Sequence, residues 1–86
     1  MTETPETRLK RLRLRSWRRG TREMDLILGP YADEALPGLD GPALDAFEAL
    51  LDEADADLYA WVAGTAPPPV PHEPAIGRVR AFHRLG

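Results

Sequence analysis

The sequence predicts a small all-α protein, a bundle of four to five helices. Three observations lead to this fold class. Apolar residues recur three and four positions apart in several segments, which is the spacing along one face of an α-helix. Glycine and proline separate these segments, and no stretch has the pattern of a convincing strand. With 86 residues, the chain has room for one domain at most and little room for a deep cleft.

The first helix is expected to open at Thr4 and Pro5. A threonine hydroxyl caps the free N–H groups of a helix N-terminus, and proline suits the first helical position. The candidates for the buried stripe of this helix are Leu9, Leu12 and Trp17. Gly20 is expected to end the helix, since glycine accepts the left-handed backbone that is common at helix C-termini.

A second helix is expected after Gly20, with Thr21 as its cap and Glu23 in its first turn, where the helix dipole favours an anion. Its apolar face is predicted to comprise Met24, Ile27, Leu28 and Tyr31. Pro30 is expected to kink or shorten this helix near its end. A loop rich in helix breakers follows at residues 35–41.

Pro42 is expected to start a third helix that runs through residues 43–54. The apolar face of this helix comprises Leu44, Phe47, Leu50 and Leu51. Asp55 is expected to cap a short fourth helix, and Gly64 to end it. The buried residues of the fourth helix are predicted to be Leu58, Trp61 and Val62.

We expect the helical bundle domain to span residues 1–64, with a linker and a tail in residues 65–86. The linker, residues 65–74, is rich in proline, so we expect it to be extended and to carry no core. Ile76, Val79 and Phe82 are three positions apart and favour a short final helix, although Gly77 weakens it.

Charge is strongly segregated along the chain, although the net charge is only -3. Eleven acids and no base lie in residues 23–64. Eight basic side chains lie in residues 8–22, namely Arg8, Lys10, Arg11, Arg13, Arg15, Arg18, Arg19 and Arg22. One interpretation is that a basic first helix folds against an acidic bundle, which neutralises it. The alternative is that residues 8–22 bind nucleic acid or an anionic surface, although no DNA-binding motif supports this.

Several functional classes lack their sequence signals. The chain has no cysteine, no run of about 18 apolar residues and no apolar signal segment at its start, so we expect a cytoplasmic protein without a membrane span. His72 and His83 are expected to be solvated in the tail, with no nucleophile or metal-ligand pattern beside them. Phosphate-binding glycine loops are absent as well. We therefore predict that the protein is not an enzyme.

The segment from Trp17 to Asp25 combines a bare backbone, both charge signs and a large aromatic side chain at the predicted corner between two helices. At Gly20 a partner's backbone could approach closely, and arginine offers a planar fork for carboxylates or carbonyls. Two interpretations are equally good on the residues alone. The corner binds a partner, or Gly20 only ends a helix and Arg19 with Glu23 forms a surface ion pair.

Residues 16–36, SWRRGTREMDLILGPYADEAL, resemble the signature region of the succinate dehydrogenase assembly factor family, whose hallmark is RGxxE. The motif here is Arg19-Gly20-Thr21-Arg22-Glu23. Its context, WxRGxxExDxxLxPY followed by the acidic segment LLDEADADLYAWVAG, makes the resemblance specific. The resemblance covers about residues 8–64. Family members often have proline where this chain has Ala56.

The resemblance implies a five-helix bundle that binds the flavoprotein subunit of succinate dehydrogenase and promotes covalent attachment of FAD to a histidine of that client. Fumarate reductase flavoprotein is implied as a second client. Gly20 would allow close approach, and Arg19 and Glu23 would make polar contacts with the client. The residues expected to flank them are Trp17, Arg18, Arg22 and Asp25. We expect no stably bound cofactor, no nucleic acid partner and a monomer.

Overall fold

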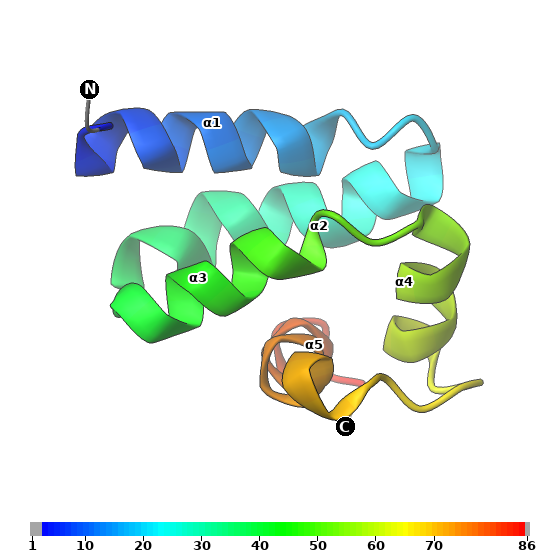
Figure 1. Ribbon diagram of the computed structural model, residues 1–86. Helices are drawn as coiled ribbons and strands as arrows, with labels where there is room; N and C mark the ends of the chain where they lie inside the picture. Colours follow the sequence, from blue (N-terminus) through cyan, green and yellow to red (C-terminus); the bar gives the residue numbers. More distant parts are fainter. Residues whose placement is uncertain (1–2, 86) are drawn as a thin grey trace.

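The computed structural model describes residues 3–85, and this range forms five α-helices. Their bounds are α1 Pro5–Trp17, α2 Arg22–Ala35, α3 Gly41–Leu50, α4 Asp55–Ala63 and α5 Glu73–Phe82. Short 3-10 turns lie at Leu36–Gly38 and Val70–His72. Figure 1 shows α1 antiparallel to α2, α3 beside α2, α4 across one end, and α5 viewed end-on beneath them. The predicted all-α fold class is confirmed.

Helix α1 begins as predicted but ends earlier than predicted. The Thr4 hydroxyl accepts a hydrogen bond from the Thr7 N–H at 3.1 Å and caps the helix. The last helical residue is Trp17, so the prediction that the helix runs on to Gly20 was wrong. The cause is a residue of α2. The Asp25 carboxylate accepts a hydrogen bond from the Arg19 N–H at 2.7 Å, so this N–H does not bond to a carbonyl of α1 as it would in a longer helix.

Helix α2 is capped by Thr21, as predicted, with the hydroxyl 3.4 Å from the Met24 nitrogen. Pro30 lies inside the helix, which continues to Ala35, where the loop was expected to begin, so of the two expected effects the proline does not shorten the helix. Proline removes one helical hydrogen bond. The turn after it nevertheless remains helical because Tyr31 and Ala32 are buried in the core and hold it there.

One core joins all five helices. Its largest fully buried side chains come from all five helices and from the residues next to them, with Val79 contributed by α5. The apolar residues of this core include Leu12, Met24, Leu28, Phe47, Leu50, Leu58, Ile76 and Val79. Tyr31 packs against Phe47 and Phe82, with ring centroids 5.4 and 5.6 Å apart.

The connection between α3 and α4 differs from the prediction at both ends. Asp40 caps α3 through the Ala43 N–H at 2.9 Å, but α3 ends at Leu50 and does not reach residue 54. Ala54, not Asp55, occupies the cap position of α4, and no side chain caps that helix. Asp55 instead lies in the first turn of α4, where the dipole favours a carboxylate.

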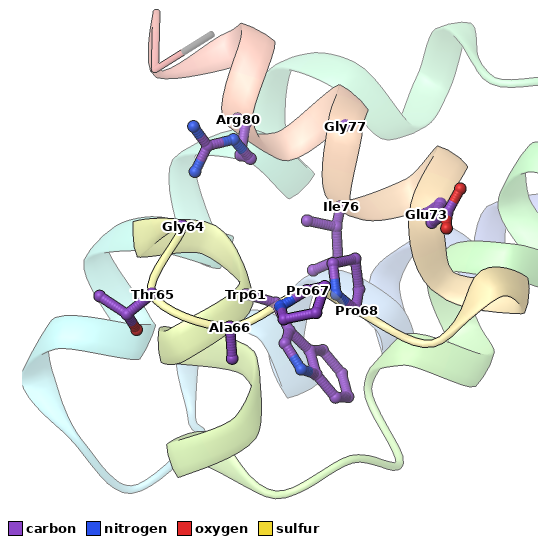
Figure 2. Close-up of a pocket in the computed structure, with 10 residues that line it drawn as sticks. All are labelled: Trp61, Gly64, Thr65, Ala66, Pro67, Pro68, Glu73, Ile76, Gly77 and Arg80. Atoms are coloured by element: carbon purple, nitrogen blue, oxygen red, sulfur yellow. The ribbon is translucent and has the colours of Figure 1, made fainter.

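The C-terminal segment is attached to the bundle through α5. Ala75, Ile76 and Val79 are buried, so the packed core extends past residue 64. Figure 2 shows Ile76 projecting from α5 toward the prolines, with the Trp61 ring below them. The Arg80 guanidinium donates to the carbonyl oxygen of Val62 at the end of α4.

The proline-rich segment carries more structure than expected. Gly64 ends α4 as predicted, with φ +82°. Ala66 then packs against the core, and Val70–His72 forms a 3-10 turn, so the expectation of a fully extended linker without core contacts was wrong. The turn is needed because α5 has to come back onto α4 and bury its apolar face.

Four arginines of α1 pair with acids on α2, on α3 and in the turn that follows α3. Their ion pairs are Arg8–Asp45 at 2.7 Å, Arg8–Glu48 at 2.8 Å, Arg11–Glu48 at 2.9 Å, Arg13–Asp33 at 3.1 Å and Arg15–Asp52 at 3.0 Å. Each pair is partly exposed and contributes at most about 1 kcal/mol to stability. Together they show that the basic first helix is paired with acids of the bundle, which is the first of the two interpretations of the segregated charge.

Candidate functional site

The turn between α1 and α2, residues 18–21, carries the centre of the RGxxE motif. Gly20 is exposed and has φ +102°, a backbone conformation that favours glycine. A Cβ at this position would meet no atom within 4 Å. The space in front of Gly20 is therefore open, and a partner's backbone can approach it.

Arg19, the first residue of the motif, points into the molecule. Its Nε donates to Asp55 Oδ1 at 2.8 Å, and its two terminal nitrogens donate to the carbonyl oxygens of Leu51 at 2.5 Å and Glu53 at 2.6 Å. Only 12% of the Arg19 side chain is exposed. The surface ion pair between Arg19 and Glu23 does not form, because Asp55 takes the place of Glu23.

The other predicted site residues divide by exposure. Arg18, Arg22 and Glu23 are exposed, whereas Asp25 is half-buried and holds the Arg19 N–H. Trp17 is 38% exposed and lies at the seam of α1 and α2, where its Nε1 donates to Asp33 Oδ2 at 3.1 Å. The structure thus brings Gly20 and Glu23 to the surface and turns Arg19 and Asp25 inward.

A shallow hollow of about 570 Å³ lies beside the motif, between the start of α2 and α4, and we call it the corner hollow. Its lining residues are Thr21, Glu23, Met24, Asp55, Ala56 and Tyr59. In Figure 1 the α1–α2 turn lies next to the start of α4, which is how two distant segments form one hollow. Tyr59 is 50% exposed and also lines a second hollow of about 400 Å³ with Ile27, His83 and Leu85.

Sequence reasoning assigned no role to Asp55 or Tyr59 in this site. Both lie in the acidic segment that supported the family resemblance, so a signal was present. The sequence could not show that these two residues belong to the site, because no local pattern reveals that α4 packs beside residues 19–23.

The two histidines are engaged within the fold. His72 Nε2 lies 2.8 Å from Glu53 Oε2, and the His72 side chain is only 14% exposed. His83 Nε2 lies 2.7 Å from the carbonyl oxygen of Ile27. The expectation of two solvated tail histidines was therefore wrong. In residues 3–85 no group of three or more His, Cys, Asp or Glu side chains is placed to hold a metal ion.

Two further observations bear on the alternative function. Five of the eight basic residues in the segment 8–22 pair with carboxylates, namely Arg8, Arg11, Arg13, Arg15 and Arg19. This pairing leaves less positive charge for phosphates or lipid head groups. Within the part of the chain that the structure describes, no helix has the length and apolarity that crossing a membrane requires.

The fold is a small helical bundle, and its candidate site is an open glycine and an exposed acid beside a shallow hollow, which has the form of a surface and not of an enclosed pocket. Comparison with known proteins identifies its family. Residues 10–83 match the family Sdh5, described as "Flavinator of succinate dehydrogenase", and the chain belongs to this family. The resemblance found in the sequence is confirmed, and the match runs past residue 64 and through α5.

Curated relatives include fungal and bacterial proteins. The chain is 40% identical over 68 residues to succinate dehydrogenase assembly factor 2, mitochondrial, of Mycosarcoma maydis, which covers 79% of this chain and 29% of the relative. It is 45% identical over 56 residues to the FAD assembly factor SdhE of Pseudomonas aeruginosa, and this match covers 65% of this chain and 66% of the relative. The chain spans less than half the length of the first fungal relatives. These names describe assembly factors, as predicted, and not enzymes.

Proposed function

We propose that this protein binds the flavoprotein subunit of succinate dehydrogenase and promotes the covalent attachment of FAD to that subunit. Membership of the flavinator family supports this proposal, and so do the names of the relatives. The observation that carries it in the structure is the exposure of Gly20 and Glu23 beside the corner hollow. A surface of this kind suits a client that brings its own backbone close to Gly20.

The proposed contacts follow from exposure. Gly20 admits the client's backbone, and Glu23 binds a basic or N–H group of the client. Arg18 and Arg22 are exposed on either side and supply positive charge. Tyr59 offers an aromatic ring with a hydroxyl at the far wall of the hollow, which is the kind of side chain that is enriched in interfaces. Trp17 and Asp25 shape the corner from behind.

The proposed mechanism is positioning. The flavin provides the reactive ring, and the client provides the histidine that becomes bonded to it. The factor only needs to hold the client in a conformation where these two groups meet. Fixing two reactants in productive geometry accelerates their reaction without any catalytic side chain on the factor.

We further propose that the factor itself holds no flavin stably, that it acts as a monomer in the cytoplasm, and that fumarate reductase flavoprotein is a second client. The names of the fungal relatives place those proteins in mitochondria.

Titration of FAD into the isolated protein should give no saturable change in flavin fluorescence at micromolar concentrations. Stoichiometric micromolar binding would contradict the proposal for the cofactor.

The proposed function is tested by replacing Glu23 with alanine and measuring covalent flavin in the client. The factor variant and the flavoprotein subunit are produced together in cells that lack the native factor, and flavin fluorescence of the client band is read after denaturing electrophoresis. Loss of one charged hydrogen bond removes about 1.5–3 kcal/mol, so client affinity should fall about 10- to 100-fold.

Glu34→Ala is the matched control. Glu34 is also an exposed acid on α2, and it forms none of the ion pairs found in residues 3–85. We expect it to support wild-type flavinylation, and both variants to keep the helical circular dichroism of the wild type. Full flavinylation by Glu23→Ala, at a factor level that limits the wild type, would refute the proposed contact.

A further inference from the structure

We propose that Arg19 acts as a positioning residue and that Asp55 is the partner that holds it in place for client binding. This inference rests on the proposed function, and it revises the role that the family resemblance implies for the motif arginine. It assigns the arginine to the inside of the binding surface. It also assigns a role to an acid that lies outside the motif.

The contacts of Arg19 leave its side chain little capacity for a client. All three guanidinium nitrogens already donate, to Asp55, Leu51 and Glu53, at 2.5 to 2.8 Å. The Arg19 and Asp55 side chains are 12% and 23% exposed. A client that recruited Arg19 would have to break these bonds and leave two carbonyl oxygens and a half-buried carboxylate without their donor, which is costly.

These three acceptors sit where two helices meet. The carbonyls of Leu51 and Glu53 follow the C-terminal end of α3, and Asp55 begins α4. Helix C-termini present carbonyl oxygens that a cation satisfies, and an acid is favoured in the first turn of the next helix. A planar guanidinium can meet acceptors in several directions at once, which an ammonium group does less well. The position therefore suits arginine in particular.

The ion pair between Arg19 and Asp55, which we call the tie, connects the two walls of the corner hollow. Thr21 and Glu23 form one wall, and Asp55, Ala56 and Tyr59 form the other. Some 36 residues separate Arg19 from Asp55 along the chain. The guanidinium that joins them lies in the first residue of the motif, directly before Gly20. We infer that this contact sets the distance between Glu23 and Tyr59, so that one client can touch both.

The test measures the affinity of purified factor for the apo-flavoprotein subunit. Asp55→Asn removes the charged acceptor, and Asp57→Asn is the matched control. Both residues lie in the first turn of α4, so each substitution costs the same dipole interaction, but only Asp55 binds Arg19. We expect Asp55→Asn to weaken binding about tenfold, and Asp57→Asn to stay within about twofold of the wild type.

A double-mutant comparison separates positioning from direct contact. If Asp55 and Arg19 act through the same tie, Arg19→Ala with Asp55→Asn should bind no more weakly than Arg19→Ala alone. Arg19→Lys, which keeps the charge but not the fork, should also lose most of the binding. Wild-type affinity in Asp55→Asn, together with strong loss in Arg19→Ala, would overturn the inference and assign Arg19 to the client interface.

A readout on the isolated protein distinguishes this inference from the proposed function. Amide hydrogen exchange at residues 20–24 should be faster in Asp55→Asn than in Asp57→Asn, with thermal unfolding still cooperative in both. Equal exchange rates in the two variants would refute the proposed positioning role of the Arg19–Asp55 contact, whether or not the factor binds the client. Failure of the wild-type factor to bind the client would instead refute the proposed function, with the exchange result unaffected.

Discussion

The indole ring of Trp17 lies directly against the backbone of Gly29. A Cβ built at position 29 would overlap with the Trp17 ring, and the ring nitrogen also donates to Asp33 one helical turn further on. The end of α1 is thereby held onto the middle of α2. Gly29 is buried in a helix, where glycine costs stability relative to alanine, and this close approach is the reason that it is needed.

Gly29→Ala should therefore destabilise the protein. The added methyl group has to displace the Trp17 ring, and such overpacking costs about 1–3 kcal/mol. Gly77→Ala is the matched control, since Gly77 lies inside α5 with nothing within 4 Å of its Cβ position. That change should stabilise by about 0.5–1 kcal/mol. Urea unfolding followed by circular dichroism measures both, and opposite signs are the expected result.

Two substitutions at Gly20 should separate the effect of backbone strain on stability from the effect of side-chain size on client binding. Alanine and arginine both meet the same strain at φ +102°, which costs about 1–2 kcal/mol, so both variants should unfold at similarly lowered temperatures. Only the arginine fills the open space in front of residue 20. Client flavinylation should be largely kept by Gly20→Ala and abolished by Gly20→Arg. Equal flavinylation by the two would show that no client backbone comes close at this position.

The ion pairs around Glu48 predict a loss of stability in acid. Hydrogen bonds from Arg11 and then Arg8 hold the pKa of Glu48 below its usual value of 4.5, against an opposing effect of burial. The folded-state pKa lies below the unfolded one, so the stabilisation is fully present above about pH 4.5 and is lost as pH falls through the folded pKa.

Glu48→Gln should accordingly lower the free energy of unfolding at pH 7 by on the order of 1 kcal/mol, a figure that is reduced for the partial exposure of the pair. The difference from the wild type should shrink as the pH is lowered past 4.5. Glu34→Gln serves as the control and should leave the stability unchanged. An undiminished difference at pH 2.5 would show that the carboxylate charge is not the cause.

Nucleic acid binding should be weak despite the basic first helix. Arg8, Arg11 and Arg15 are paired with acids of the bundle, so few counterions would be released from a duplex. Fluorescence anisotropy with a labelled 20-base-pair duplex should show no saturation at micromolar protein in 50 mM salt. Anionic vesicles should give the same outcome. Tight binding with a steep salt dependence would instead favour the alternative function.

Some features of this protein follow from the sequence alone, because their causes are local. The caps at Thr4 and Thr21, the left-handed end of α4 at Gly64 and the apolar faces of the helices each depend on residues within a turn or two of one another. The family was recognisable from the spacing around the RGxxE motif, which the family comparison confirmed. The exposure of Gly20 and Glu23 agrees with their expected place at a surface corner.

Only the tertiary structure decided which way the motif arginine points. Arg19 meets Asp55, and His83 meets the carbonyl of Ile27, across separations of 36 and 56 residues. No periodic pattern reports such pairs, because periodicity describes one helix and not the helix it packs against. The docking of α5 has the same origin. The motif Arg19 to Glu23 could be found in the sequence, but the burial of Arg19 beside the exposed Gly20 and Glu23 depends on where α4 lies.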